Sequence, residues 1–386
     1  MKEKAYISGS VLRWSRETAK FSLDEVAKRM LCDTSKVEEW ENEKDFPTLK
    51  QAEKLSQLFR RPLAVFFLPS PPEDFQTLRD FRNKSAQKDY STALTFVIRD
   101  IQQKQNWLKE FLLSEGENPL AFIDKYSKSN KVDEIAKDII TQLDIDRSIK
   151  TNDYLKYFID KVETKRIYVS LTSNIHSHLP ILIDEVRGFA ISDSMAPFIF
   201  INSSDSKNGQ LFTLVHELAH LWLNTSGISN IDTIEFRENS ANYDPIEILC
   251  NEIAAEILMP TIHIKEYFNN KKIELNYIDS IAKILNVSSY ALSVRLLNLN
   301  YIEKKYFFQL KEIFEKRYLE YLEREAQKTK KIVVNWYILQ IRKNSRAFTH
   351  NIYDFYKGGR ITGYEASSLL NVKISNFQKL EKFLFA

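Results

Sequence analysis

The chain has 386 residues, and its 44% hydrophobic content is too high for a largely disordered protein and sufficient for packed cores. The formal net charge of +3 is too small to indicate nucleic-acid binding by itself, and the 2 cysteines argue against a disulfide framework. We expect no signal peptide and no membrane contact, because the N-terminus lacks an apolar run and no stretch approaches the roughly 18 apolar residues of a membrane span. The length predicts two or three domains, and we expect a mostly helical, cytoplasmic protein.

Residues 10 to 68 predict a bundle of short helices. Ser22 precedes one helix and has Glu25 three residues later, which is the capping-box pattern. A second helix is expected over 34–41, capped by a hydroxyl, and a third helix opens after Thr48. Two short helices joined by a tight turn suit a helix-turn-helix.

The order of residues in these helices resembles the Cro/C1-type (Xre-like) helix-turn-helix module, with the matching positions at Val26, Ala27, Val37, Trp40, Glu41, Pro47, Thr48, Leu49 and Leu55. The resemblance implies a domain over residues 1–70, whose recognition helix would present Thr34, Ser35 and Lys36 to DNA. Six acidic residues and two lysines lie between Asp33 and Asp45, however, which opposes phosphate binding.

Cations elsewhere in this domain compensate in part for its acidic helix, and they are Arg13, Arg16, Lys20, Lys28 and Arg29. Binding of operator DNA through residues 22–41 therefore stays open beside two alternatives. In these alternatives the module binds another protein or forms a homodimer.

A proline-rich linker follows at residues 69–74, since proline stiffens the chain and ends helices. We expect residues 71–150 to form this linker and packing helices, because residues 91–113 and 132–160 show helical periodicity. Strand patterns are confined to residues 166–202.

Three strands are predicted, at residues 166–171, 187–192 and 197–202, and the last two form a hairpin. This small sheet leads into the helix that residues 211–223 predict. Its edge strand can pair with an extended peptide. His176 and His178 are expected in an exposed loop between strands, where His178 is a candidate transition-state stabiliser.

Residues 211–223 predict a helix that is apolar around nearly its whole circumference and therefore buried. It nevertheless carries His216, Glu217 and His220. The two histidines lie one turn apart on one face, and burial of polar groups is costly unless something satisfies them. The spacing His-Glu-x-x-His places two imidazoles for one zinc ion, with the glutamate as general base.

A catalytic zinc site needs a third protein ligand, and residues 245–259 offer one. Glu247 and Asn251 lie on the flank of the helix's apolar face, whereas Glu252 and Glu256 point to the opposite side, where water alone would satisfy them. We expect Glu247 to be the third ligand and Asn251 to orient one of the histidines. Tyr243, just before this helix, is a second candidate transition-state stabiliser.

These two helices together resemble the ImmA/IrrE family of metallopeptidases, through the segment Phe212 to His220 and the segment Glu247 to Pro260. The resemblance implies a zincin-like domain over 151–300 that uses Zn²⁺ and cleaves a Cro/C1-type repressor, which derepresses mobile-element or stress genes. The alternative is a transcriptional regulator or antitoxin, in which the peptidase fold binds a toxin without turnover.

Residues 276–299 predict two short helices, and residues 301–386 a helical C-terminal extension. Its dense mixed charge over 303–345 is typical of a solvated amphipathic helix. A turn at 355–362 precedes a further helix, which Thr362 is expected to cap. The expected fold class is thus mostly α with a small β-sheet, built from a helix-turn-helix bundle, a metallopeptidase domain and this extension.

Overall fold

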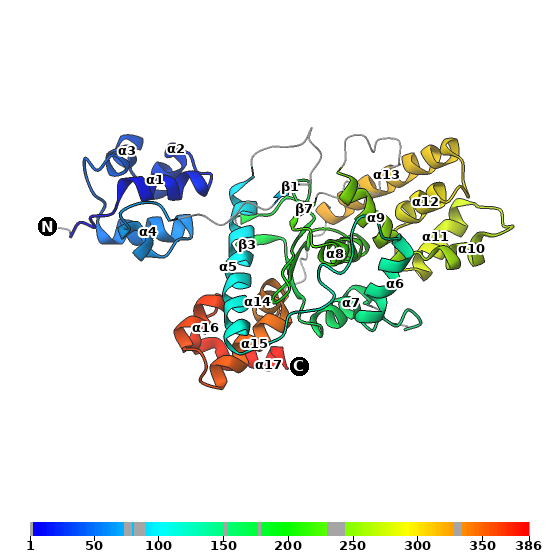
Figure 1. Cartoon of the computed structure of the whole chain (residues 1–386). Coiled ribbons are helices and arrows are strands. Elements are labelled where there is room, and N and C mark those ends of the chain that lie inside the picture. Colours follow the sequence, from blue (N-terminus) through cyan, green and yellow to red (C-terminus); the bar gives the residue numbers. More distant parts are fainter. Residues whose placement is uncertain are drawn as a thin grey trace. The chain divides into compact units, whose positions relative to one another are not determined.

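The computed structural model describes residues 3–72, 79–80, 90–149, 151, 153–176, 179–229, 244–327 and 334–385 (Figure 1). The predicted fold class, mostly α with a small β-sheet, is confirmed. The chain forms two compact units. Unit 1 comprises Met1–Thr77, Lys88–Gln103 and Asn174–Ile181, and unit 2 comprises Leu78–Gln87, Lys104–Ser173 and Leu182–Ala386.

Unit 1 contains the predicted short helices, which are α1 (Gly9–Thr18), α2 (Leu23–Met30), α3 (Thr34–Glu41), α4 (Leu49–Phe59) and the 3₁₀ helix η1 (Leu63–Phe67). Ser22 and Glu25 form the expected capping box. The prediction of a hydroxyl cap for α3 is wrong, because the N-cap residue is Asp33, whose side chain makes no capping hydrogen bond. The Thr34 hydroxyl instead donates to Asp24 at 2.8 Å.

An ion pair joins α1 to the end of α3 within unit 1. Arg16 Nε lies 2.6 Å from Glu41 Oε1, and Arg16 Nη2 donates to Glu41 Oε2 at 3.0 Å. Arg13 Nε reaches the same carboxylate at 3.4 Å. Since the Glu41 side chain is only 3% exposed, these guanidinium groups offset a buried charge. Two of the cations expected to favour DNA binding are therefore engaged inside the domain.

The helical stretch expected over 132–160 is two helices, α6 (Val132–Gln142) and α7 (Tyr154–Glu163), which follow α5 (Thr92–Ser114). Asp144, at φ 51°, turns the chain between them. The Asp153 carboxylate accepts a hydrogen bond from the Lys156 N–H and so begins α7.

The main sheet has five strands in the order β1 (Arg79–Asp80), β7 (Gly227–Ser229), β5 (Gly188–Ile191), β6 (Phe198–Asn202) and β2 (Tyr168–Thr172). The predicted hairpin is confirmed, because β5 pairs with β6 in antiparallel fashion, while β2 pairs with β6 in parallel. The residues of β5 and β6 are buried throughout, which explains their near-continuous apolar sequences.

The prediction that strands are confined to residues 166–202 is wrong, since β1 and β7 lie outside that range. Strands of two or three residues are too short to show alternation in the sequence. His176 was expected in a loop, but it belongs to β3 (Asn174–His176), which pairs with β4 (Leu179–Pro180) in unit 1.

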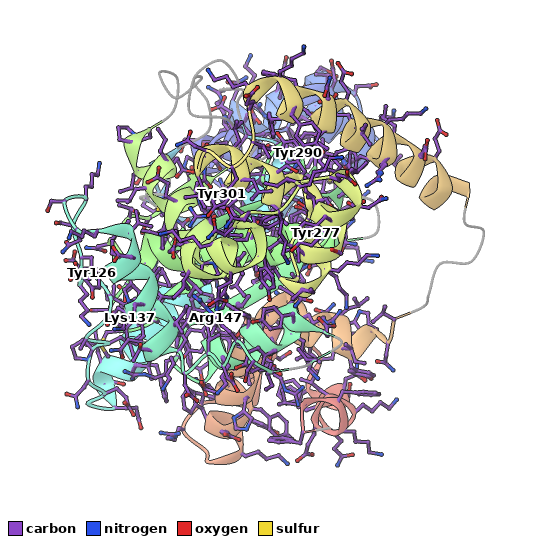
Figure 2. All side chains as sticks on the ribbon, turned by 90° about the vertical axis from the view of Figure 1, so that its right-hand side faces the viewer. Tyr126, Lys137, Arg147, Tyr277, Tyr290 and Tyr301 are labelled. Atoms are coloured by element: carbon purple, nitrogen blue, oxygen red, sulfur yellow. The ribbon has the colours of Figure 1, made fainter. Side chains whose placement is uncertain are left out.

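After residue 260 the chain continues with the helices α10 (Thr261–Phe268), α11 (Leu275–Ile284), α12 (Ser289–Asn298), α13 (Lys304–Gln327), α14 (Trp336–Asn344), α15 (Arg346–Lys357), α16 (Gly363–Leu370), η4 (Ile374–Asn376) and α17 (Phe377–Leu384). Thr362 caps α16 in a capping box with Glu365, as expected. Figure 2 shows Tyr277, Tyr290 and Tyr301 over the yellow helices, where they pack against the core.

The C-terminal helices α14 and α15 pack against β2 within unit 2. The Ser170 hydroxyl donates to the carbonyl of Lys343 at 2.6 Å, and the Asn351 amide donates to the Tyr168 hydroxyl at 3.0 Å. The extension is therefore part of the same compact unit as the sheet. None of the helices among the described residues combines the length and apolar character that a membrane span needs.

Candidate metal centre

Two buried helices, α8 (Lys207–Trp222) and α9 (Pro245–Leu258), carry the predicted ligands. Every residue of α8 from Gln210 to Trp222 is buried, as its uniformly apolar sequence predicts. Ser206 caps α8 and Asp244 caps α9, which has proline at its first position. The two helices pack against each other in the main core of unit 2.

His216, His220 and Glu247 converge at one point between these helices. The two Nε2 atoms lie 3.0 Å apart. Glu247 Oε2 lies 3.3 Å from His216 Nε2, and Glu247 Oε1 lies 3.0 Å from His220 Nε2. All three side chains are buried, and their ligand atoms lie within 4.8 Å of one another. One cation could therefore reach all three.

The other nitrogen of each imidazole is engaged elsewhere. His216 Nδ1 lies 2.9 Å from Asn251 Oδ1, and His220 Nδ1 lies 2.7 Å from Thr225 Oγ1. An amide oxygen only accepts, so His216 Nδ1 carries a proton and its Nε2 presents a lone pair. The site thus brings electron-rich nitrogen and carboxylate atoms together in a buried place. Two imidazoles and one carboxylate are donors that Zn²⁺ prefers, so these residues fit a zinc ion.

The charge states of the cluster also suit a cation. Burial raises the pKa of Glu247, but the facing His220 and His216 imidazoles outweigh that effect and bring this pKa down to about 2. Burial lowers the pKa of His220, although Glu247 opposes that shift. The carboxylate is consequently anionic and the His220 imidazole neutral, which are the forms that bind metals.

Glu217 lies on α8 between the two histidines and is fully buried. Strand β5 passes close to it, and glycine at position 188 makes that approach feasible. A Cβ at Gly188 would lie 2.4 Å from Thr213 Cγ2, 2.9 Å from the Phe200 carbonyl oxygen and 3.2 Å from Glu217 Oε1. Gly188 was not predicted as a site residue. Its importance comes from the short distance between β5 and α8, which the sequence pattern does not give.

Some of the other residues predicted to belong to the site lie outside the part of the chain that the structure describes. His178 and Tyr243, the candidate transition-state stabilisers, both lie outside the described residues. Glu256 was expected to need only water, but it pairs with Arg295 and accepts a hydrogen bond of 2.7 Å from the Thr261 hydroxyl. Glu256 has this protein partner because α12 brings Arg295 against the end of α9.

Cys250 lies on α9 one turn beyond Glu247 and is fully buried. Burial raises the pKa of its thiol well above the ordinary value. The thiol therefore stays protonated and behaves as a small apolar side chain.

The candidate DNA-contacting residues lie at the start of α3. Ser35 is exposed, and Thr34 is engaged by Asp24. Lys36 Nζ lies 2.9 Å from Glu39 Oε2 and 2.5 Å from Asp45 Oδ2. The positive charge of Lys36 is thus shared between two carboxylates, which weakens its attraction for phosphate.

Comparison with known families identifies one segment. Residues 177–297 match the family model of the IrrE N-terminal-like domain, Peptidase_M78. The match covers less than half of the chain and contains His216, Glu217, His220 and Glu247. It supports the resemblance to the ImmA/IrrE family and a possible metallopeptidase role for this segment. No curated protein matches the sequence significantly. The Cro/C1-type resemblance of residues 1–70 stays a prediction.

Proposed function

We propose that the chain is a zinc-dependent endopeptidase, with His216, His220 and Glu247 as metal ligands and Glu217 as general base. The observation that carries the proposal is the convergence of three buried ligand atoms within 4.8 Å of one another, on two helices of which one also carries the buried Glu217. The match of residues 177–297 to a peptidase family supports the same function.

A zinc ion in this site would act as a Lewis acid that polarises the scissile carbonyl and makes water more acidic. Glu217 follows His216 directly in α8 and is buried there, and we assign it the role of general base. It accepts a proton from the attacking water and passes it to the leaving amine. The apolar residues around α8 limit the access of bulk water, which strengthens these electrostatic interactions.

The substrate that we propose is a Cro/C1-type repressor, whose cleavage would derepress mobile-element or stress genes. This proposal rests on the resemblance to the ImmA/IrrE family, and it places the protein in the cytoplasm. Unit 1 would then serve as a protein-recognition or dimerisation module. The engagement of Arg13, Arg16 and Lys36 with carboxylates favours that role over binding of operator DNA.

The test is cleavage of a co-expressed repressor from the neighbouring locus by the wild type and by Glu217→Gln. The substitution keeps the size of the side chain but removes its proton acceptor. We expect zinc content to persist and cleavage to fall by about 10² to 10⁴, the usual contribution of general acid–base catalysis. Glu252→Gln, on α9 but outside the ligand cluster, is the control and should cleave normally.

A different result would support the regulator or antitoxin function. In that case the wild type and Glu217→Gln would protect equally against a neighbouring toxin, and neither would produce a repressor fragment. This pattern would refute the peptidase proposal and leave any bound zinc with a structural role.

A further inference from the structure

The end of α8 folds the chain back onto His220. Asn224 has a φ of 47°, in the left-handed region that asparagine tolerates better than most residues. The Asn224 N–H donates to the carbonyl of Leu221 at 3.2 Å, and the Thr225 N–H donates to the carbonyl of His220 at 2.9 Å. These two bonds form a Schellman motif. The motif places Thr225 directly against His220.

The Thr225 hydroxyl contacts His220 at two atoms. Thr225 Oγ1 lies 3.3 Å from the His220 carbonyl oxygen and 2.7 Å from His220 Nδ1. A carbonyl oxygen only accepts hydrogen bonds, so the arrangement that uses both contacts directs the single hydroxyl proton to the carbonyl. The hydroxyl then offers only a lone pair to the ring. In that arrangement His220 Nδ1 carries the ring proton, and Nε2 presents its lone pair to the ligand cluster.

We propose that Thr225 is a positioning residue that holds His220 in the tautomer required for metal binding. The inference rests on the metal centre of the proposed function. Asn251 holds His216 in the same tautomer from α9, so each imidazole is oriented by its own partner. Groups that hydrogen-bond to the far nitrogen of a ligand histidine fix its ring orientation and raise its basicity.

A competing arrangement explains why this hydroxyl is needed. His220 Nε2 lies 3.0 Å from Glu247 Oε1. If the ring proton moved to Nε2, it would form a hydrogen bond to that carboxylate and occupy the direction of the metal. Thr225 opposes this change, because its hydroxyl accepts from Nδ1 while its own proton remains on the His220 carbonyl.

The test compares Thr225→Val with Thr225→Ser in the full-length chain. Valine matches threonine in shape and keeps the backbone N–H of the Schellman motif, but it lacks the hydroxyl, which serine retains. The control is Thr164→Val at the end of α7, where the hydroxyl donates to the Lys161 carbonyl at 2.6 Å.

Two quantities are measured. The ¹⁵N chemical shifts of the His220 ring report its tautomer in metal-free protein, and competition with a chelator reports zinc affinity. We expect the proton on Nδ1 in the wild type, in Thr225→Ser and in Thr164→Val. In Thr225→Val we expect it to shift to Nε2, with zinc affinity lower by about 10-fold to 100-fold, the usual effect of losing such a partner.

Unchanged tautomer and zinc affinity in Thr225→Val would overturn the inference while leaving the metal centre intact. Equal loss in Thr225→Ser and Thr225→Val would also overturn it, since serine keeps the hydroxyl. If the wild type binds no zinc, the proposed function fails instead. The ring signals of the metal-free protein still decide in that case whether Thr225 sets the tautomer.

Discussion

The carboxylate of Glu163 accepts a hydrogen bond of 2.6 Å from the hydroxyl of Ser345, which links the end of α7 to the junction between α14 and α15. The same carboxylate also accepts from the backbone N–H of Val169 and of Ala347, at 3.3 and 3.2 Å. Ser345 has a φ of 72°, and its hydroxyl caps α15 by accepting from the Phe348 N–H. One acidic side chain thus fastens the C-terminal helices to the sheet.

This contact predicts a pH-dependent stability. Burial of the carboxylate raises the pKa of Glu163 from 4.5 to about 7, against the lowering effect of its three donors. Between these values the folded state binds more protons than the unfolded state, so the contribution of Glu163 to the free energy of unfolding decreases as pH rises through that range.

The measurement is denaturant unfolding at about pH 5 and about pH 8, for metal-free protein, because this interval brackets the raised pKa. Glu163→Gln cannot titrate, so we expect it to lose part of the decrease that the wild type shows. Glu110→Gln, an exposed position on α5, is the control and should behave as the wild type. Identical pH dependence in Glu163→Gln and the wild type would contradict the prediction.

Metal content distinguishes Glu247 from the other acidic residues of α9. We expect Glu247→Ala to lose zinc, because the carboxylate is one of only three side chains in the described cluster. Glu252→Ala should keep about one zinc per chain, the stoichiometry of a single three-ligand site. Metal analysis of the purified variants checks this, and full zinc content in Glu247→Ala would remove that residue from the site.

Gly188→Ala tests the close approach of β5 to α8. The added methyl group would overlap the Thr213 side chain and the Phe200 carbonyl. We expect a loss of about 1–3 kcal/mol in the free energy of unfolding, typical of overpacking. We also expect reduced cleavage, because the methyl group would lie 3.2 Å from Glu217 Oε1.

Two further variants isolate the cause of the Gly188 effect. Thr213→Ser removes the methyl group nearest the new Cβ, so combining it with Gly188→Ala should restore part of the stability. Gly363→Ala is the matched control, since a Cβ there would meet only side-chain atoms at its closest, Ile374 Cδ1 and Tyr356 Cε2 at 3.2 and 3.3 Å, and no backbone atom as near. A Gly188→Ala protein as stable and active as the wild type would show that β5 can move away without cost.

The Arg16–Glu41 pair predicts a double-mutant effect in unit 1. Arg16→Met leaves the buried Glu41 carboxylate, among the residues that the structure describes, with the longer ion pair to Arg13, and we expect a loss of about 3 kcal/mol. Arg16→Met combined with Glu41→Met removes both charges and should recover most of that loss. Lys28→Met, at an exposed site on α2, is the control. Urea unfolding of the wild type, Arg16→Met, Glu41→Met and the double variant gives the coupling, and additive losses would show that the pair contributes little.

The sequence alone was sufficient to predict the buried helix over 211–223 and the candidate ligands that the structure brings together. A spacing of four residues places His216 and His220 on one helical face, whatever the rest of the fold does. The apolar face of 245–259 likewise indicated that Glu247 lies inward and Glu252 does not. The caps formed by Ser22 and Thr362 were also predictable, because a capping box involves residues only three positions apart. These features depend on local geometry, which a sequence pattern records.

Only the tertiary structure revealed the contacts that support the site. Thr225 reaches His220 because a turn reverses the chain after α8, and Gly188 matters because a strand passes against Glu217. The bond between Glu163 and Ser345 joins residues 182 positions apart. The Gly188 and Glu163 contacts depend on how distant elements pack, and no helical or strand period in the sequence specifies which elements meet. The sequence therefore determined the candidate ligands, while the packing of helices and strands decided which groups orient and surround them.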